Sequence, residues 1–298
     1  MAVVRTVLGD VAPEELGVCN SHDHLFFRSV MLPGQELDDF DAAVSEATLF
    51  AEAGGRTVVQ WTPHGLGRRA DLLPELSQQT GVHVVAATGL HRAEHYPALP
   101  EQDLAELFVQ ELTQGIGDSE VRAGLIKIAG GFHGLDQHAR WFLDAAAEAQ
   151  QATGAPIAIH HELGTGADAV LDRLEGHGVA LDRIVLGHLN RFPDHQVHQE
   201  LAARGAFLAF DGPSRANHAT DWRMVDCLAA LAETGYADRL LVGGDTTTAR
   251  ARVATGEGPG MPYLLHTLRP RLTRRLGPDV VDLIFVANPA RAFATTWT

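Results

Sequence analysis

The chain has 298 residues, of which 45% are hydrophobic and 20% are charged. This composition is typical of a protein with a large core, and it excludes a disordered or fibrous protein. Lysine and arginine together number 23 and aspartate and glutamate 38, so the net charge is −15. Such an acidic chain lacks the basic surface that binds nucleic acid or an anionic membrane.

Membrane and export signals are also missing from the sequence. No apolar run approaches the ~18 residues of a transmembrane helix, and the start of the chain lacks the apolar core of a signal peptide. The two cysteines, Cys19 and Cys227, are too few for a disulfide framework. These features predict a reduced, cytoplasmic protein.

Eight short apolar segments predict β-strands, and segments of helical periodicity separate most of them. The predicted strands are 18–25, 57–63, 82–90, 124–131, 156–163, 183–189, 206–212 and 239–246. The predicted helices include 41–53, 104–114, 139–153, 167–176, 196–204 and 221–234. Apolar strands that alternate with helices are typical of a parallel sheet, and eight of them favour an α/β fold of the (β/α)8 barrel type.

A single barrel domain over residues 1–298 accounts for this pattern, since no Ser/Pro/Gly-rich linker divides the chain. The alternative is a doubly wound open sheet. That fold would normally carry a glycine-rich phosphate-binding turn early in the chain, and none is present. The glycine-rich segment 254–262 follows the last predicted strand, and we expect it to be a mobile active-site loop.

Polar residues end five of the eight predicted strands. They are His22, His24, Lys127, His160, His188 and Asp245. Barrel enzymes carry their catalytic groups at the carboxyl ends of the strands, so we expect these side chains to meet in an active site at that end. His22 and His24 fall on the same side of one strand, where both can bind one cation.

Lys127 is the only lysine, so 22 of the 23 basic side chains are arginines. Arginine keeps its proton in proteins, whereas a buried lysine can become a neutral amine. The alternation of Lys127 with Ile126 and Ile128 predicts that the lysine faces the barrel axis. The same alternation turns His160 inward and His161 toward the helices or the following loop. Core histidines that bind neighbouring carbonyls are the alternative interpretation.

Loops after the strands would bind the substrate. His91, Arg215 and Arg250 are predicted to contact it. Further loop candidates are Trp61, His64, Arg92, His133, Asp211 and Arg252. The apolar residues Phe26, Phe27 and Met31 are expected in a pocket wall, in a subunit interface or in the core.

Seven segments carry a resemblance to a known family: 6–9 (TVLG), 21–25 (SHDHL), 121–129 (VRAGLIKIA), 154–160 (GAPIAIH), 184–188 (IVLGH), 241–245 (LVGGD) and 288–291 (NPAR). On these segments the chain resembles the phosphotriesterase family of the amidohydrolase superfamily along almost its whole length. The resemblance implies a (β/α)8 barrel, a binuclear metal centre, usually of zinc, and a homodimer.

The resemblance also implies the ligands: His22, His24 and Asp245 for one metal ion, His160 and His188 for the other, and a Lys127 carboxylated by carbon dioxide that bridges both with a hydroxide. Two cations beside four neutral imidazoles need negative charge, which Asp245 and a lysine carbamate supply. A hydroxide between two metal ions is a nucleophile at neutral pH, and Asp245 would accept its proton. Zn²⁺ suits such ligands, with Mn²⁺, Co²⁺ or Fe²⁺ as alternatives.

The predicted substrate is a small-molecule lactone or a related carboxyl ester, and the resemblance implies a side activity on organophosphate triesters. The segments 88–91 (TGLH) and 211–213 (DGP) depart from the lactone-hydrolysing branch, which weakens an acyl-homoserine-lactone assignment. The alternatives are a primary phosphotriesterase, an amide or carbamate hydrolase, and a non-catalytic protein that binds a metal or a small molecule.

Overall fold

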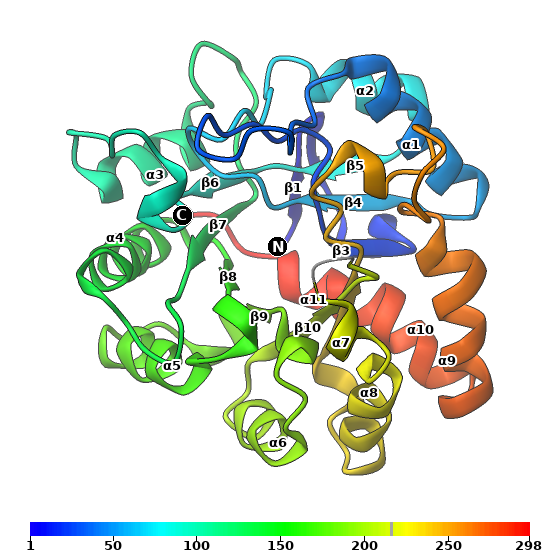
Figure 1. Cartoon of the computed structure of the whole chain (residues 1–298). Coiled ribbons are helices and arrows are strands. Elements are labelled where there is room, and N and C mark those ends of the chain that lie inside the picture. Colours follow the sequence, from blue (N-terminus) through cyan, green and yellow to red (C-terminus); the bar gives the residue numbers. More distant parts are fainter. Residues whose placement is uncertain (215–216) are drawn as a thin grey trace.

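Parallel strands form the centre of the molecule and helices surround them, in a computed structural model that describes residues 1–214 and 217–298 (Figure 1). The strands are β1 (Val4–Thr6), β2 (Gly9–Val11), β3 (Cys19–Asp23), β4 (Thr57–Gln60), β5 (His83–Val85), β6 (Ala87–Gly89), β7 (Leu125–Ala129), β8 (Ile157–His160), β9 (Ile184–Gly187), β10 (Phe207–Asp211) and β11 (Leu240–Gly243). The α-helices are α1 (Phe40–Glu52), α2 (Leu73–Thr80), α3 (Leu104–Thr113), α4 (Gln137–Thr153), α5 (Ala167–Gly176), α6 (His195–Ala203), α7 (His218–Asp221), α8 (Met224–Glu233), α9 (Arg269–Leu276), α10 (Pro278–Asp282) and α11 (Asn288–Phe293).

Two parallel sheets make up the barrel wall. One has the strand order β11–β10–β9–β8–β7–β6 and the other the order β3–β4–β5. Only Ala86 separates β5 from β6, so this segment joins the two sheets. At the other join, the backbone amide of Asp245 donates to the carbonyl of His22 over 3.0 Å. A Cβ atom on Gly243 would lie 2.6 Å from the Cβ of His22, so the close approach of β11 to β3 requires a glycine.

All eight predicted strands are present, with the segment 82–90 divided into β5 and β6. The predicted (β/α)8 barrel is therefore confirmed. The sequence analysis missed the antiparallel hairpin of β1 and β2. This hairpin begins beside the end of the chain, where Val3 and Thr295 exchange backbone hydrogen bonds of 2.9 and 3.0 Å.

Side chains of the barrel strands alternate between two hydrophobic layers. Ile126 and Ile128 belong to the layer between strands and helices, whereas Ala158 belongs to a smaller cluster inside the barrel. Lys127 is in register with Ala158 on the neighbouring strand, and its side chain is buried. The inward orientation predicted for Lys127 is therefore confirmed. His161 faces away from the pocket described below, and its Nδ1 lies 3.2 Å from the carbonyl oxygen of Thr165, as the alternation predicted.

Aspartates begin several of the helices that pack against the barrel. Asp39, Asp103, Asp136 and Asp194 each accept hydrogen bonds from backbone amides in the first turn of α1, α3, α4 and α6. These N-caps satisfy amide groups that have no partner within the helix. Among the residues described, no helix combines the length and the hydrophobicity that spanning a bilayer requires.

The segment 254–262, predicted to be a mobile active-site loop, is hydrogen-bonded to α1 near both of its ends. The carboxylate of Glu46 accepts hydrogen bonds from the amides of Ala254, over 2.9 Å, and Met261, over 2.7 Å. Glu46 is fully buried, and burying a carboxylate is costly unless it is hydrogen-bonded. The two amides therefore stabilise the buried carboxylate as well as fixing the segment to α1.

Candidate active site

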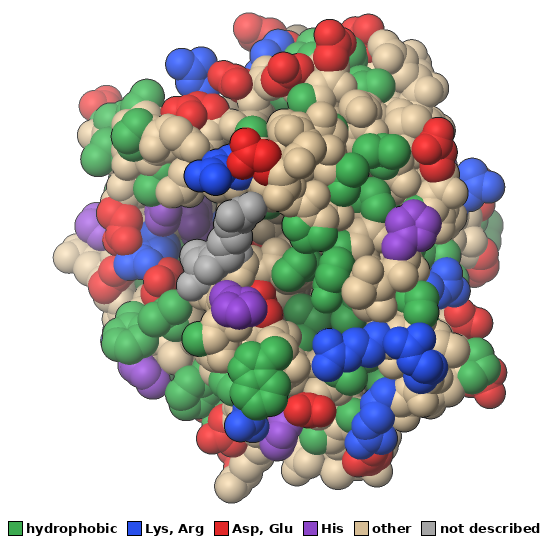
Figure 2. Space-filling view, turned by 45° about the vertical axis from the view of Figure 1, so that its right-hand side comes forward, with side chains coloured by type: hydrophobic (Ala, Val, Ile, Leu, Met, Phe, Trp, Pro, Cys, Tyr) green, Lys and Arg blue, Asp and Glu red, His purple; other side chains and the backbone are tan. Residues whose placement is uncertain are grey.

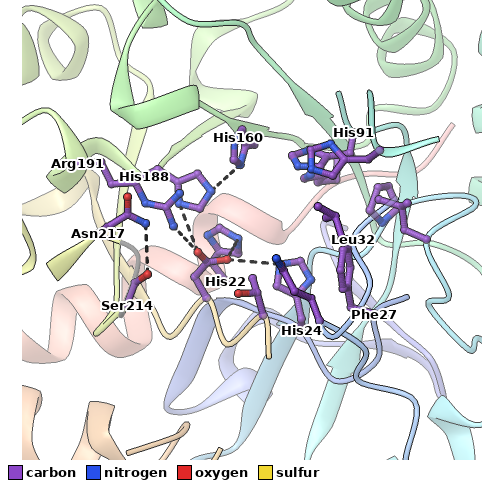
Figure 3. A pocket seen from close by; sticks show the side chains of 17 residues that line it. His22, His24, Phe27, Leu32, His91, His160, His188, Arg191, Ser214 and Asn217 are labelled. Carbon is purple, nitrogen blue, oxygen red and sulfur yellow. Dashed lines mark hydrogen bonds and ion pairs between the residues drawn. The ribbon is translucent and has the colours of Figure 1, made fainter. Parts of the chain in front are cut away.

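A cavity of about 200 Å³ opens at the carboxyl ends of the barrel strands (Figure 3). Its lining residues are His22, His24, Phe27, Leu32, Gln35, Pro63, Leu66, His91, His95, Lys127, His160, His188, Arg191, Ser214, Asn217, Asp245 and Thr247. The six strand-end residues singled out from the sequence all belong to this lining. The structure therefore brings them together, and Figure 3 shows the four labelled histidines of the set around one space.

The first group within the cavity consists of His22, His24 and Asp245. Nε2 of each histidine lies 3.4 Å from Oδ1 of Asp245. The other nitrogen of His24, Nδ1, is 2.8 Å from the hydroxyl of Thr62, which fixes the ring. The ring of His22 stacks on Trp61, with 3.7 Å between the centroids. Both rings are thus held with Nε2 directed at the same carboxylate oxygen.

The second group consists of His160 and His188. Nδ1 of His160 and Nε2 of His188 are 2.7 Å apart. On its other side, the His188 ring places Nδ1 2.8 and 2.9 Å from the two carboxylate oxygens of Asp211. A carboxylate only accepts, so Nδ1 carries the proton and Nε2 presents its lone pair to the cavity.

Backbone conformation sets two of these residues apart. His188 follows β9 with φ +65° and Asp245 follows β11 with φ +49°. Residues other than glycine rarely adopt the left-handed region, and such positions cluster at functional sites. Here the left-handed turn directs each side chain into the cavity as the strand ends.

Lys127 lies in the cavity beside His91. Its Nζ is 2.6 Å from Nδ1 of His91. Burial lowers the pKa of Lys127 to about 7, although the charge of Asp245 opposes this shift. Near neutral pH a large fraction of this amine is therefore unprotonated and nucleophilic. His91, predicted to bind substrate, lines the cavity and also contacts this amine.

Burial disfavours the charged form of several histidines of the cavity. It lowers the pKa of His24 and His91, and it lowers the pKa of His188 to about 4. The pKa of His160 falls well below its usual value for the same reason. Neutral imidazole is the form that binds metal ions. His24, His160 and His188 are therefore candidate metal ligands at neutral pH.

Arg191 is a functional candidate that the sequence analysis missed. Its guanidinium lines the cavity, pairs with the carboxylate of Asp245 and lies 3.3 Å from Oδ1 of Asp211. Burial opposes ionisation of Asp245. In the acidic range where a carboxylate titrates, the charges of protonated His188 and of Arg191 outweigh burial and hold the pKa of Asp245 well below its usual range. The signal in the sequence was its position three residues after His188, at the start of the loop that follows β9.

The other loop candidates lie in different surroundings. His64 binds Glu111 over 3.0 Å, Arg92 pairs with Glu162, and the buried Arg252 donates to the carbonyl of His24 over 3.2 Å. Their contacts hold the loops together. His133 packs edge-on against Phe192, with 5.9 Å between the centroids.

Of the two arginines predicted to bind substrate, the structure describes Arg250. Arg250 is exposed and donates to Glu257 over 2.7 Å, and it contributes nothing to the lining. Its predicted role has no support from its position. Arg215 lies outside the described residues.

The three apolar candidates separate into three environments. Phe26 is fully buried in the core, Phe27 lines the cavity, and Met31 is exposed. Figure 2 shows acidic side chains scattered over one face of the molecule, with basic and histidine side chains among them.

The donors in the cavity fit divalent cations. Two ligands bound 2.0–2.1 Å from a tetrahedral Zn²⁺ are about 3.3 Å apart, which is close to the 3.4 Å between each histidine Nε2 and Asp245 Oδ1. Hydrogen bonds of this length are weak, so the three groups gain little from one another directly. Nitrogen and carboxylate ligands of this kind suit zinc and other first-row transition metals.

A parallel barrel whose strand ends bring histidines, a lysine and an aspartate into one cavity defines a hydrolase-type (β/α)8 protein with a candidate metal centre. Residues 2–293 match the phosphotriesterase family, and the chain belongs to this family. The resemblance noted in the sequence is thereby confirmed.

Relatives of known activity cover almost the whole chain. A phospho-furanose lactonase of Mycoplasmopsis synoviae is 29% identical over 97% of this chain and 91% of its own length. An N-acetyltaurine hydrolase of Danio rerio is 27% identical over 97% of both chains. The crystal structure of a lactonase from Listeria monocytogenes matches with a TM-score of 0.92, 28% identity and 99% coverage of both chains. These relatives confirm the prediction that the protein is a hydrolase.

Proposed function

We propose that this protein is a binuclear metal-dependent hydrolase that opens a lactone or cleaves a related carboxyl ester. The observation that supports the proposal most strongly is the convergence of four histidines, Lys127 and Asp245 on one cavity at the strand ends. Each of these side chains can bind a cation in the protonation state that its surroundings favour.

Two groups of ligands account for two cations. His22, His24 and Asp245 would hold one, and His160 and His188 would hold the other. Zn²⁺ is the ion that we favour, with Mn²⁺, Co²⁺ and Fe²⁺ as alternatives. When bound, such ions polarise an ester carbonyl and make water a better nucleophile at neutral pH.

Lys127 supplies the remaining negative charge in this proposal. Its unprotonated amine attacks carbon dioxide and loses a proton, which gives an anionic carbamate. The low pKa of the buried amine favours this reaction, because an ammonium group cannot attack. A carbamate at this position would add a negative charge to the cavity that both ligand groups line.

Asp245 is the proton acceptor in the proposed reaction. Its carboxylate stays ionised, since its pKa is held well below the usual range. It takes a proton from the attacking water and returns it to the alkoxide that leaves. Arg191, paired with the same carboxylate, orients Asp245 toward the cavity.

The size of the cavity favours a small substrate. About 200 Å³ lies below the usual range for drug-sized ligands, about 300–1,000 Å³, and suits a single small ring. The named lactonases among the relatives support a lactone. Among the described residues of the lining, Arg191 is the one arginine, and it already faces two carboxylates. A phosphate on the substrate is therefore not required by this cavity.

A panel of substrates tests the proposal. The protein is loaded in turn with Zn²⁺, Mn²⁺ and Co²⁺ and assayed against γ- and δ-lactones, with and without a phosphate, and against aryl dialkyl phosphate triesters. We expect lactones to be hydrolysed with the highest kcat/KM. Absence of turnover on every lactone in protein that contains two metal ions per chain would overturn the proposal.

Amide hydrolysis is the second candidate, because an N-acetyltaurine hydrolase matches this chain over 97% of its length. The same ligand groups can serve an amide, whose leaving amine also needs a proton from Asp245. N-acetylated amino acids and N-acetyltaurine in the same panel distinguish the two. The cytoplasmic location, the homodimer, the single domain over residues 1–298 and the side activity on organophosphates stay predictions.

A further inference from the structure

A second cluster of metal-binding side chains lies outside the cavity, between α6 and α8, which are side by side in Figure 1. It consists of His195 and His198, one turn apart on α6, and Cys227 on α8. One potential ligand atom from each residue lies within 4.8 Å of the other two. None of the three lines the candidate active site.

The hydrogen bonds of His198 define which nitrogen is available. Nε2 of His198 lies 3.1 Å from the carbonyl oxygens of both Leu189 and Phe192. Carbonyl oxygens only accept, so Nε2 carries the proton and Nδ1 keeps a lone pair. Nδ1 is buried and has no hydrogen-bond partner. A histidine that donates through one nitrogen to a carbonyl and presents the other is the usual arrangement of a metal ligand.

His195 and Cys227 lack partners in the same place. Nδ1 of His195 is also buried without a hydrogen-bond partner. Cys227 is fully buried and forms no disulfide. A buried ring nitrogen without a partner is destabilising, and this cluster brings two histidines that each have one together with the sulfur of Cys227.

We propose that His195, His198 and Cys227 form a structural metal site for Zn²⁺ or a similar thiophilic cation, separate from the active site. Zn–N distances of 2.0–2.1 Å and Zn–S distances of about 2.3 Å place tetrahedral ligands about 3.3–3.7 Å apart. The potential ligand atoms lie within 4.8 Å of one another, so binding requires the side chains to move closer, and His195 is the one of the three that is only half-buried. On binding, the thiol of Cys227 releases its proton to solvent and the thiolate bonds to the cation.

Such a site would stabilise the loop that carries Arg191. His198 already binds the carbonyl of Leu189, the first residue of the helical turn Leu189–Arg191, and that of Phe192, the residue that follows the turn. A cation on the opposite nitrogen fixes this ring and links α6 to α8. The loop beside the active site is then fastened to two helices.

Cobalt is the probe that separates this site from the active site. A thiolate bound to Co²⁺ gives a charge-transfer absorption in the near ultraviolet, and the cavity lining contains no cysteine. We expect full-length protein titrated with CoCl₂ to show this band. The Cys227→Ala variant should lose it, whereas the matched control Cys19→Ala, which removes the other buried cysteine, should keep it.

His195→Ala provides a variant that is less disruptive, because this side chain is partly exposed. It should weaken the Co²⁺ affinity reported by the band at least about tenfold while the fold is retained by circular dichroism. Zinc X-ray absorption should show a Zn–S distance of about 2.3 Å in the wild type. Absence of the band in cobalt-loaded wild-type protein, or its persistence in Cys227→Ala, would overturn the proposal. Either result is independent of hydrolase activity.

Discussion

The carboxylate of Asp211 holds His188 at two points. It accepts a hydrogen bond from the backbone amide of His188 over 3.0 Å, and its two oxygens lie 2.8 and 2.9 Å from the ring Nδ1. Asp211 is the last residue of β10, and His188 directly follows the neighbouring strand β9. This contact fixes both the left-handed backbone of His188 and the tautomer that directs Nε2 into the cavity.

Replacing Asp211 by asparagine should lower metal affinity or activity about 10–100-fold, because a neutral amide no longer fixes the tautomer of His188. Metal content by mass spectrometry and kcat/KM on the best lactone are the measurements. Asp172→Asn is the control, since this carboxylate is on the surface and pairs with Arg204. Equal losses in both variants would show that Asp211 has no specific role.

Lys127→Arg should abolish activity, because a guanidinium cannot form a carbamate. Lys127→Ala should be partly rescued by acetate or propionate, which can restore a carboxylate in the vacated space. The measurement is turnover with increasing concentrations of the acid, with chloride at the same ionic strength as the control. Undiminished turnover in Lys127→Arg would remove the lysine from the mechanism.

Asp245→Asn should reduce kcat by roughly 10²–10⁴, the usual contribution of a general base. The amide keeps the shape of the side chain and its contact with His24 but cannot take a proton. Metal content must be measured on the same preparation, since loss of a ligand also lowers the rate. Normal kcat in fully loaded Asp245→Asn would exclude Asp245 as the base.

The stability of the protein should decrease in acid through Glu111 on α3. Burial by itself raises the pKa of Glu111, but hydrogen bonds from His64, Arg68 and Thr88 and the charge of Arg68 outweigh it and lower the pKa to about 2. A carboxylate whose pKa falls on folding stabilises the native state above its unfolded pKa of 4.5, and this stabilisation is lost as the pH falls toward 2.

Glu111→Gln should remove that pH dependence. The full contribution is about 3 kcal/mol, of which about 1 kcal/mol is lost by pH 3.5. Urea unfolding at pH 7 and pH 3.5 measures the free energy of unfolding of both proteins. Glu106→Gln, at an exposed position on the same helix, is the control. A difference between wild type and Glu111→Gln that is the same at both pH values would contradict this assignment.

Much of the barrel could be predicted because its strands are short, apolar and buried on both faces. The alternation around Lys127 sufficed to place the lysine inside, since a period of two leaves only two faces to choose from. The hairpin of β1 and β2 was missed because three-residue strands carry too little pattern. The helices α2 and α9–α11 were missed as well, and two of them are only five or six residues long.

The candidate site likewise contains some residues that the sequence could identify and others that it could not. His22, His24, Lys127, His160, His188 and Asp245 could be selected because strand ends of a barrel meet at one edge. Arg191 was missed, because its position after His188 gains meaning only from the carboxylates of Asp211, which ends β10, and Asp245, which follows β11. The cluster of His195, His198 and Cys227 was equally hidden, since α6 and α8 pack together only in the folded chain.

The strand alternation, the inward lysine and the set of candidate cation ligands follow from the chain's own pattern, because local periodicity decides which face a side chain occupies. Only the tertiary structure decided which residues act on those groups: Asp211 on His188, Arg191 on Asp245, and Glu46 on the segment 254–262. The physical reason is distance along the chain. These contacts join residues 20 or more positions apart. A local sequence pattern therefore cannot predict which buried charged residues will form a pair.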